Sequence, residues 1–166
     1  VRKIGRKVLS GKIVETEAYF GKEDPASRAH LGWPKYCVEM LYGKVGKTLI
    51  YMVHGNWLLN VVAHGKGKGG AVLIRAIRPL QGIEEMMKNR KVDNLLQLTN
   101  GPGKLTKALK ITIEQNGLDV TDPKSEVLIC DKGEKVRICS SKRMGVRKDL
   151  DVNLRFYIKD NEFVSR

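Results

Sequence analysis

Two glutamates and a tyrosine alternate along one short segment of the sequence. Residues 12–20 read Lys-Ile-Val-Glu-Thr-Glu-Ala-Tyr-Phe, which is rich in the β-branched and aromatic residues typical of strands. Alternate residues of a strand share a face, so Glu15, Glu17 and Tyr19 are expected on one side. The opposite side, which we expect to pack on the core, consists of Val14, Thr16, Ala18 and Phe20.

A carboxylate beside an aromatic ring suits hydrolysis of an N-glycosidic bond. A base inside a duplex must leave the stack before it can react, and an aromatic face can hold it outside. The carboxylate of Glu17 would then activate a water and stabilise the positive charge that grows on the sugar. No lysine nucleophile is needed, so lyase activity is not expected. The alternative is a solvated strand face, because glutamates are rarely buried unless paired.

The charge of the chain indicates a polyanionic partner. Lys and Arg number 31 against 18 Asp and Glu, a net charge of +13. Such a field favours nucleic acid, with an anionic membrane surface or a general solubility surface as alternatives. The sequence has no basic amphipathic helix and no apolar run approaching ~20 residues, which argues against a membrane partner. Nucleic acid is therefore the expected partner.

Cysteine and histidine usage indicates neither a metal nor a disulfide framework. The three cysteines, Cys37, Cys130 and Cys139, are isolated and odd in number. The three histidines share no metal-ligand spacing with them. We expect no metal and no cofactor, and an intracellular location: cytoplasm, nucleoid or, in a eukaryote, nucleus.

The elements that would position these residues are mainly strands. A hairpin is expected over 8–9 and 12–20, turning at Ser10-Gly11. Further strands are expected at 48–53, 57–63, 71–77, 126–130, 135–139 and 154–158, and helices at 82–90 and 104–109. Residues 21–47 are irregular, as functional loops often are. The sequence predicts one α+β domain over residues 1–166, with a curved, mostly antiparallel, open-barrel-like sheet flanked by a few helices. A further segment before Val1 is also expected.

Several motifs, in chain order, resemble the alkyladenine (3-methyladenine) DNA glycosylase family. Residues 11–19, Gly-Lys-Ile-Val-Glu-Thr-Glu-Ala-Tyr, are similar to its signature strand, and residues 71–80 to a later strand. The other similar segments are 23–27, 49–51, 60–62, 100–105, 143–146, 154–158 and 164–166. Together they cover nearly the whole chain. The resemblance implies a base excision repair enzyme that acts as a monomer on double-stranded DNA. It would flip out a damaged purine, such as 3-methyladenine or hypoxanthine, and hydrolyse its bond to the sugar.

The resemblance also implies roles for individual residues. Glu17 matches the family's water-activating base, and Tyr19 and Tyr51 match the aromatic residues on either side of the flipped base. His54 takes the position of the wedge that fills the gap in the duplex. Asn60 matches an asparagine that disfavours the exocyclic amine of guanine.

Basic residues within the matched motifs are candidates for contacts to DNA phosphates. These are Arg75, Lys104 and Arg143. Each has a plainer reading, since a single strand arginine or surface lysine can simply raise the positive field. Tyr51 likewise could be an ordinary core aromatic residue.

Three features depart from the family pattern. Arg28 stands where the family has a histidine in the pocket wall, and His30 follows two residues later, so either could complete the pocket. A guanidinium against the base would favour a neutral purine over a cationic one. His54 is smaller than the usual tyrosine, and the stretch from His54 to Asn60 is one residue shorter than usual. These departures keep open a second hypothesis, a non-catalytic nucleic-acid-binding protein on the same fold.

Overall fold

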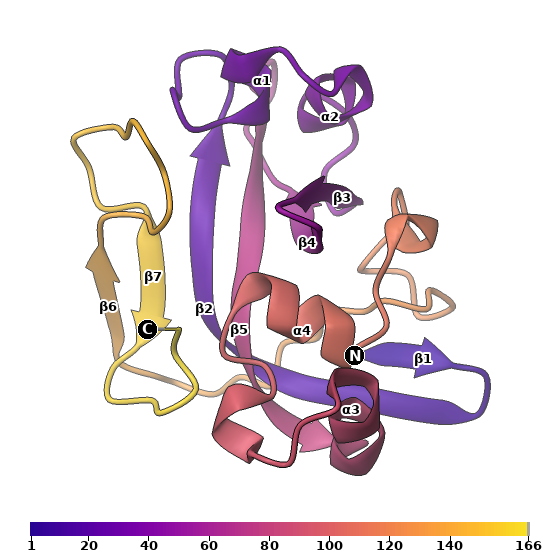
Figure 1. Ribbon diagram of the computed structural model, residues 1–166. Coiled ribbons are helices and arrows are strands. Elements are labelled where there is room, and N and C mark those ends of the chain that lie inside the picture. Colours follow the sequence, from indigo (N-terminus) through magenta and orange to yellow (C-terminus); the bar gives the residue numbers. More distant parts are fainter. Residues whose placement is uncertain (166) are drawn as a thin grey trace.

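The computed structural model describes residues 1–165 and contains one antiparallel sheet with helices beside it (Figure 1). The strands are β1 (Arg2–Ile4), β2 (Lys7–Phe20), β3 (Thr48–Val53), β4 (Asn56–Val62), β5 (Gly70–Gln81), β6 (Ile138–Ser141) and β7 (Arg155–Ile158). The helices are α1 (Arg28–Leu31), α2 (Lys35–Leu41), α3 (Ile83–Arg90) and α4 (Pro102–Ala108), with short 3-10 helices at Leu95–Gln97 and Ile113–Gln115. The predicted α+β fold class, with a mostly antiparallel open sheet, is confirmed. Arg166, in the motif 164–166, lies outside the described residues.

The sheet is open, with the strand order β3-β4-β5-β2-β7-β6 and with β1 paired to β2 off this path. The two longest strands, β2 and β5, run side by side and curve through the molecule (Figure 1). Around Glu15 and Glu17, β2 pairs with β5 on one edge and with β7 on the other. The acidic segment therefore lies in the middle of the sheet, where neighbouring strands hold its backbone on both sides.

The N-terminal hairpin turns earlier than expected. The chain reverses at Gly5-Arg6, where Gly5 adopts a φ of 56°, and residues 7–20 form one continuous strand. Ser10-Gly11 is instead the site of a register shift between β2 and β5. A Cβ atom on Gly11 would lie 2.8 Å from the carbonyl oxygen of Arg78. The small residues thus mark a close approach of two strands rather than a turn.

Other differences from the expected elements follow from pairing. The strand expected at 71–77 continues to Gln81 through Pro79, which lies opposite Gly11 at the irregular end of the ladder. The strand expected at 126–130 is reduced to one bridge, between Arg2 and Val127, because β1 is only 3 residues long. The strand expected at 135–139 begins only at Ile138. The irregular region 21–47 includes α1 and α2.

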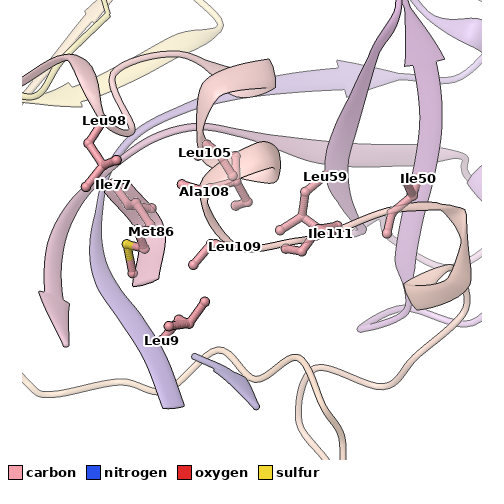
Figure 2. Packing of buried hydrophobic residues seen from close by; sticks show 11 residues of the cluster. Leu9, Ile50, Leu59, Ile77, Met86, Leu98, Leu105, Ala108, Leu109 and Ile111 are labelled. Carbon is pink, nitrogen blue, oxygen red and sulfur yellow. The ribbon is translucent and has the colours of Figure 1, made fainter. Parts of the chain in front are cut away.

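The main hydrophobic core packs α3 and α4 against the sheet (Figure 2). Leu105 and Ala108 of α4 and Met86 of α3 are completely buried, together with Ile50 of β3. Burying a side chain such as Leu105 contributes about 1.5–3 kcal/mol to folding. A second, smaller cluster holds α1 and α2 on β3 and β4; its members include Ala29, Leu41, Leu49, Tyr51 and Val62.

A large apolar cavity lies away from the place where Glu17, Tyr19 and Tyr51 gather. It measures about 440 Å³ and is lined mainly by aliphatic side chains of β2, β5, α4 and residues 127–138. Glu17, Tyr19 and Tyr51 do not line it. Charge and hydrogen bonding, rather than cavity size, therefore locate the candidate site. None of the helices formed by residues 1–165 combines the length and apolarity needed to cross a membrane.

Candidate active site

The face of β2 that carries the glutamates is buried, although the opposite face was the one expected to pack on the core. Glu15 and Glu17 are 1% and 0% exposed, whereas Phe20, expected in the core, is 41% exposed. Register shifts around Glu15 interrupt the ladder between β2 and β5. Val14 is buried as well, so both faces of the strand are covered here and alternation alone does not identify the core face. The solvated-face interpretation of the two glutamates does not fit the structure.

Glu17 accepts three hydrogen bonds. Its Oε2 atom accepts from the Tyr19 hydroxyl at 2.8 Å and from Nη1 of Arg75 at 3.2 Å. Its Oε1 atom accepts from the backbone N–H of Met144 at 2.7 Å. Burial and the neighbouring carboxylate of Glu17 raise the pKa of Tyr19 well above its usual value. Tyr19 therefore stays protonated and donates to Glu17.

Glu15 lies at the centre of a second network, which supports the first. Its carboxylate accepts from Nε of Arg75 at 2.9 Å and from Nε of Arg155 at 2.7 Å. The backbone N–H and the hydroxyl of Ser165 also donate to it. Burial alone would raise the pKa of Glu15, but these hydrogen bonds outweigh burial and lower it. Arg75 bridges the two glutamates and fixes their relative positions.

A buried ion pair ties the loop after β2 to the segment that contacts Glu17. Arg143 donates to both carboxylate oxygens of Asp24, each at 2.7 Å, and to the carbonyl of Ala18 at 2.9 Å. Asp149 accepts from the same guanidinium. The guanidinium carbon lies 4.5 Å from the centre of the Tyr19 ring. One face of Tyr19 is thereby covered by a fixed cation.

A small pocket lies between Tyr19 and Tyr51. Its volume is about 10 Å³, and it is lined by Tyr19, Ser27, Arg28, Leu41, Leu49, Tyr51, Asn60 and Ala71. The Arg28 guanidinium carbon lies 4.7 Å from the centre of the Tyr51 ring. Asn60 is buried, and its amide nitrogen donates to the carbonyl of Leu49 at 3.1 Å. Four residues predicted to contact the base thus meet in one pocket.

The pocket includes Arg28 but not His30. The side chain of His30 is exposed and hydrogen-bonds to the carbonyl oxygen of Lys22 at 2.8 Å. His54 is exposed at the turn between β3 and β4, with a φ of 47°. Lys104 lies in α4 and donates to the side chain of Asn100 at 2.7 Å. The wedge role of His54 and the phosphate role of Lys104 stay predictions.

In this structure Arg75 and Arg143 are bonded inside the protein, and their expected contacts to DNA phosphates stay predictions. The side chain of Arg75 is 10% exposed and its guanidinium bonds to both glutamates and Ser165. The side chain of Arg143 has no exposed surface. Both arginines donate hydrogen bonds to buried carboxylates. These ion pairs explain how acidic residues are retained in the interior of a basic protein. Neither arginine is an ordinary solvated charge.

Sequence reasoning did not identify four partners of the site. Asp24, Met144, Arg155 and Ser165 lie in segments that resembled the family, but only their positions in the fold reveal their hydrogen bonds. Among residues 1–165, no group of three or more His, Cys, Asp or Glu side chains is arranged to hold a metal ion. That the reaction needs no cofactor stays a prediction.

Comparison with known proteins identifies the class of this protein as DNA glycosylases, which are hydrolases. The family model described as "Methylpurine-DNA glycosylase (MPG)" matches residues 1–162. The chain belongs to the methylpurine-DNA glycosylase family, which confirms the resemblance found in the sequence.

Three bacterial relatives, each named "Putative 3-methyladenine DNA glycosylase", illustrate the similarity. The protein of Francisella tularensis subsp. tularensis (strain WY96-3418) is 41% identical over 170 residues, covering 100% of this chain and 87% of the relative. That of Chlorobium phaeobacteroides (strain BS1) is 42% identical, covering 93% and 78%. That of Prosthecochloris aestuarii (strain DSM 271 / SK 413) is 42% identical, covering 94% and 75%.

Proposed function

We propose that this protein removes a damaged purine from double-stranded DNA by hydrolysing its N-glycosidic bond, with Glu17 as the general base. The observation that carries the proposal is a fully buried carboxylate, held by three donors, that accepts a hydrogen bond from an aromatic residue of the pocket wall. Such a carboxylate can orient and deprotonate a water, and its negative charge can stabilise an electron-poor sugar.

The hydrogen bonds of Glu17 leave room for the reacting water. A carboxylate has roughly four lone-pair positions, and the donors described above occupy three of them. The remaining position would accept a hydrogen bond from water and direct its oxygen to the anomeric carbon. Because Arg75 and Met144 hold both oxygens of Glu17, little reorganisation is needed when the nucleotide arrives.

The aromatic pocket would receive the extruded base. Stacking on an aromatic ring is worth about 1–3 kcal/mol per base, which helps to offset the cost of unstacking. Tyr19 and Tyr51 would contact the faces of the purine, and the buried Asn60 would contact its edge. His54, exposed at its turn, would fill the gap in the duplex, and Lys104 would contact a phosphate.

The first prediction tests the role of Glu17. A duplex with a single hypoxanthine or methylated purine is incubated with the protein and then heated in alkali, which cleaves the strand wherever a base is missing. Glu17→Gln should lower base release at least a hundredfold, because the amide cannot accept a proton, and should leave DNA binding unchanged or tighter. Glu39→Gln is the matched control, since this glutamate is exposed on α2.

The same assay separates the competing hypotheses. If Glu17→Gln releases the base at the normal rate, Glu17 is not the general base. Tight binding of the natural protein without release from any lesion would favour a non-catalytic binder on the same fold. Lyase activity is tested by borohydride, which traps a Schiff base between a protein amine and the sugar. We expect no trapped complex, because a water is the proposed nucleophile.

A further inference from the structure

Arg28 brings an uncompensated positive charge to the pocket. Burial raises the pKa of Tyr51, Tyr36 and Cys37, and the charge of Arg28 acts against that rise at all three groups. Within residues 1–165, the ion pairs of the site involve Arg75, Arg143 and Arg155 and not Arg28. The buried carboxylates of the site, Glu15, Glu17 and Asp24, are thus bound to these other arginines.

The pocket must open before a purine can enter. Tyr19 and Arg28 are the partly exposed side chains of its wall, and Tyr19 is held by its hydrogen bond to Glu17, so Arg28 is the one that can move aside. A volume of about 10 Å³ is roughly that of one water probe, far below that of a purine ring. Ser27, Leu41 and Leu49 of the pocket wall are 0–2% exposed and tightly packed. Arg28 is partly exposed, and its long side chain can rotate without moving the backbone of α1.

We propose that Arg28 makes the pocket selective for uncharged damaged purines, an inference that rests on the function proposed above. The guanidinium occupies the face of Tyr51, so an incoming ring must either stack on it or displace it by a few ångströms. A neutral ring stacks favourably on a guanidinium. A cationic ring at that distance is repelled, and the low polarity of a partly buried site strengthens the repulsion.

The charge of the base separates two groups of lesions. A purine nucleotide methylated at N7 or N3 carries a positive charge, whereas hypoxanthine is neutral. A cationic purine also leaves the sugar more readily, so the two rates of one protein cannot be compared directly. Comparing the ratio of kcat/KM for the two lesions between variants cancels this intrinsic difference.

The experiment uses two duplexes, one with a single 7-methylguanine and one with a single hypoxanthine. Arg28→Gln keeps a side chain of similar shape without charge, and Arg28→Lys keeps the charge without the planar group. The 7-methylguanine to hypoxanthine ratio of kcat/KM should rise at least tenfold in Arg28→Gln and change less than threefold in Arg28→Lys. Arg6→Gln removes an exposed charge at the turn between β1 and β2 and should leave the ratio unchanged.

A ratio for Arg28→Gln within twofold of the natural chain would overturn the inference. A second measurement avoids turnover: equilibrium binding of both duplexes by Glu17→Gln, with and without Arg28→Gln, should show the same shift toward 7-methylguanine. If the natural chain releases no base but binding shows this shift, the proposed hydrolysis is wrong and the selectivity conferred by Arg28 is supported. If release depends on Glu17 and neither measurement shifts, the selectivity is wrong and the proposed hydrolysis is supported.

Discussion

At the scale of single residues, two glutamates with nearly the same neighbours in the sequence differ in how many hydrogen bonds their carboxylates already accept. Glu15 accepts hydrogen bonds from Arg75, Arg155 and both polar groups of Ser165, so its carboxylate is saturated. Glu17 has fewer donors and borders the aromatic pocket through Tyr19. In the proposed function, the distribution of donors, not the acid itself, distinguishes a structural carboxylate from one with a position left for water.

The saturation of Glu15 predicts a large effect on stability. Within the described part of the chain, Glu15→Gln leaves Arg155 without a carboxylate partner and leaves Arg75 paired with Glu17 alone, and an uncompensated buried charge is costly. The free energy of unfolding, measured with urea, should fall by about 3–5 kcal/mol. Glu39→Gln, which breaks an exposed pair with Lys35, should change it by less than about 0.5 kcal/mol. A loss below 1 kcal/mol in Glu15→Gln would mean that water or rearrangement replaces the carboxylate.

At the scale of elements, the site is assembled by segments that meet across β2. The loop after β2 contributes Asp24, and the segment before β7 contributes Arg143 and Met144. Burial alone would raise the pKa of Asp24, but hydrogen bonds from Arg143 and from the backbone N–H groups of Phe20 and Ala26 outweigh burial and lower it. The Asp24–Arg143 pair therefore fastens two irregular segments to the sheet only while Asp24 is ionised.

This pair predicts sensitivity to acid. Because the pKa of Asp24 is lower in the folded state, its stabilisation is fully present above the unfolded value of about 3.9 and is lost as pH falls through the folded value. Asp24→Asn should lower the free energy of unfolding by about 3 kcal/mol at pH 7. The difference from the natural chain should shrink progressively below about pH 4. Urea unfolding between pH 7 and pH 2 measures it; a constant difference would exclude Asp24 as the titrating group.

The sequence predicted the features that depend on neighbouring residues and missed those that depend on residues far apart in the chain. The strand Thr48–Val53 appeared as predicted, and Tyr19 lies beside Glu17 because alternation is a local property. The partners of buried charges are not local: Asp24 and Arg143 are 119 residues apart. The turn predicted at Ser10-Gly11 was wrong because small residues also serve where two strands approach closely.

At the scale of the whole molecule, the net charge of +13 surrounds an acidic centre. Lys66 and Lys68 are exposed in the loop between β4 and β5, and that loop rejoins the sheet at Gly70, opposite Phe20. The basic loop therefore lies at the same end of β2 as Tyr19. The helix α3 lies at the other end of the molecule (Figure 1).

This arrangement predicts which lysines bind DNA. Replacing both Lys66 and Lys68 with Gln should reduce the slope of log K against log salt concentration by about 1.8, because each phosphate contact contributes about 0.9. Replacing Lys88 and Lys91 of the α3 region, which are also exposed, should change the slope by less than about 0.5. Titrations of one duplex at several salt concentrations measure both. Equal slopes for the two double variants would place the DNA elsewhere.

The bonds from Ser165 to Glu15 span 150 residues of sequence. A ribosome adds all of those residues after it has made Glu15. A nascent chain can therefore contain Glu17, Tyr19 and the other pocket residues long before Ser165 is available to donate hydrogen bonds to Glu15. Proteolytic trimming ahead of Ser165 would return a finished molecule to that state. The order of synthesis thus delays the rigid form of the site until almost the whole described chain has emerged.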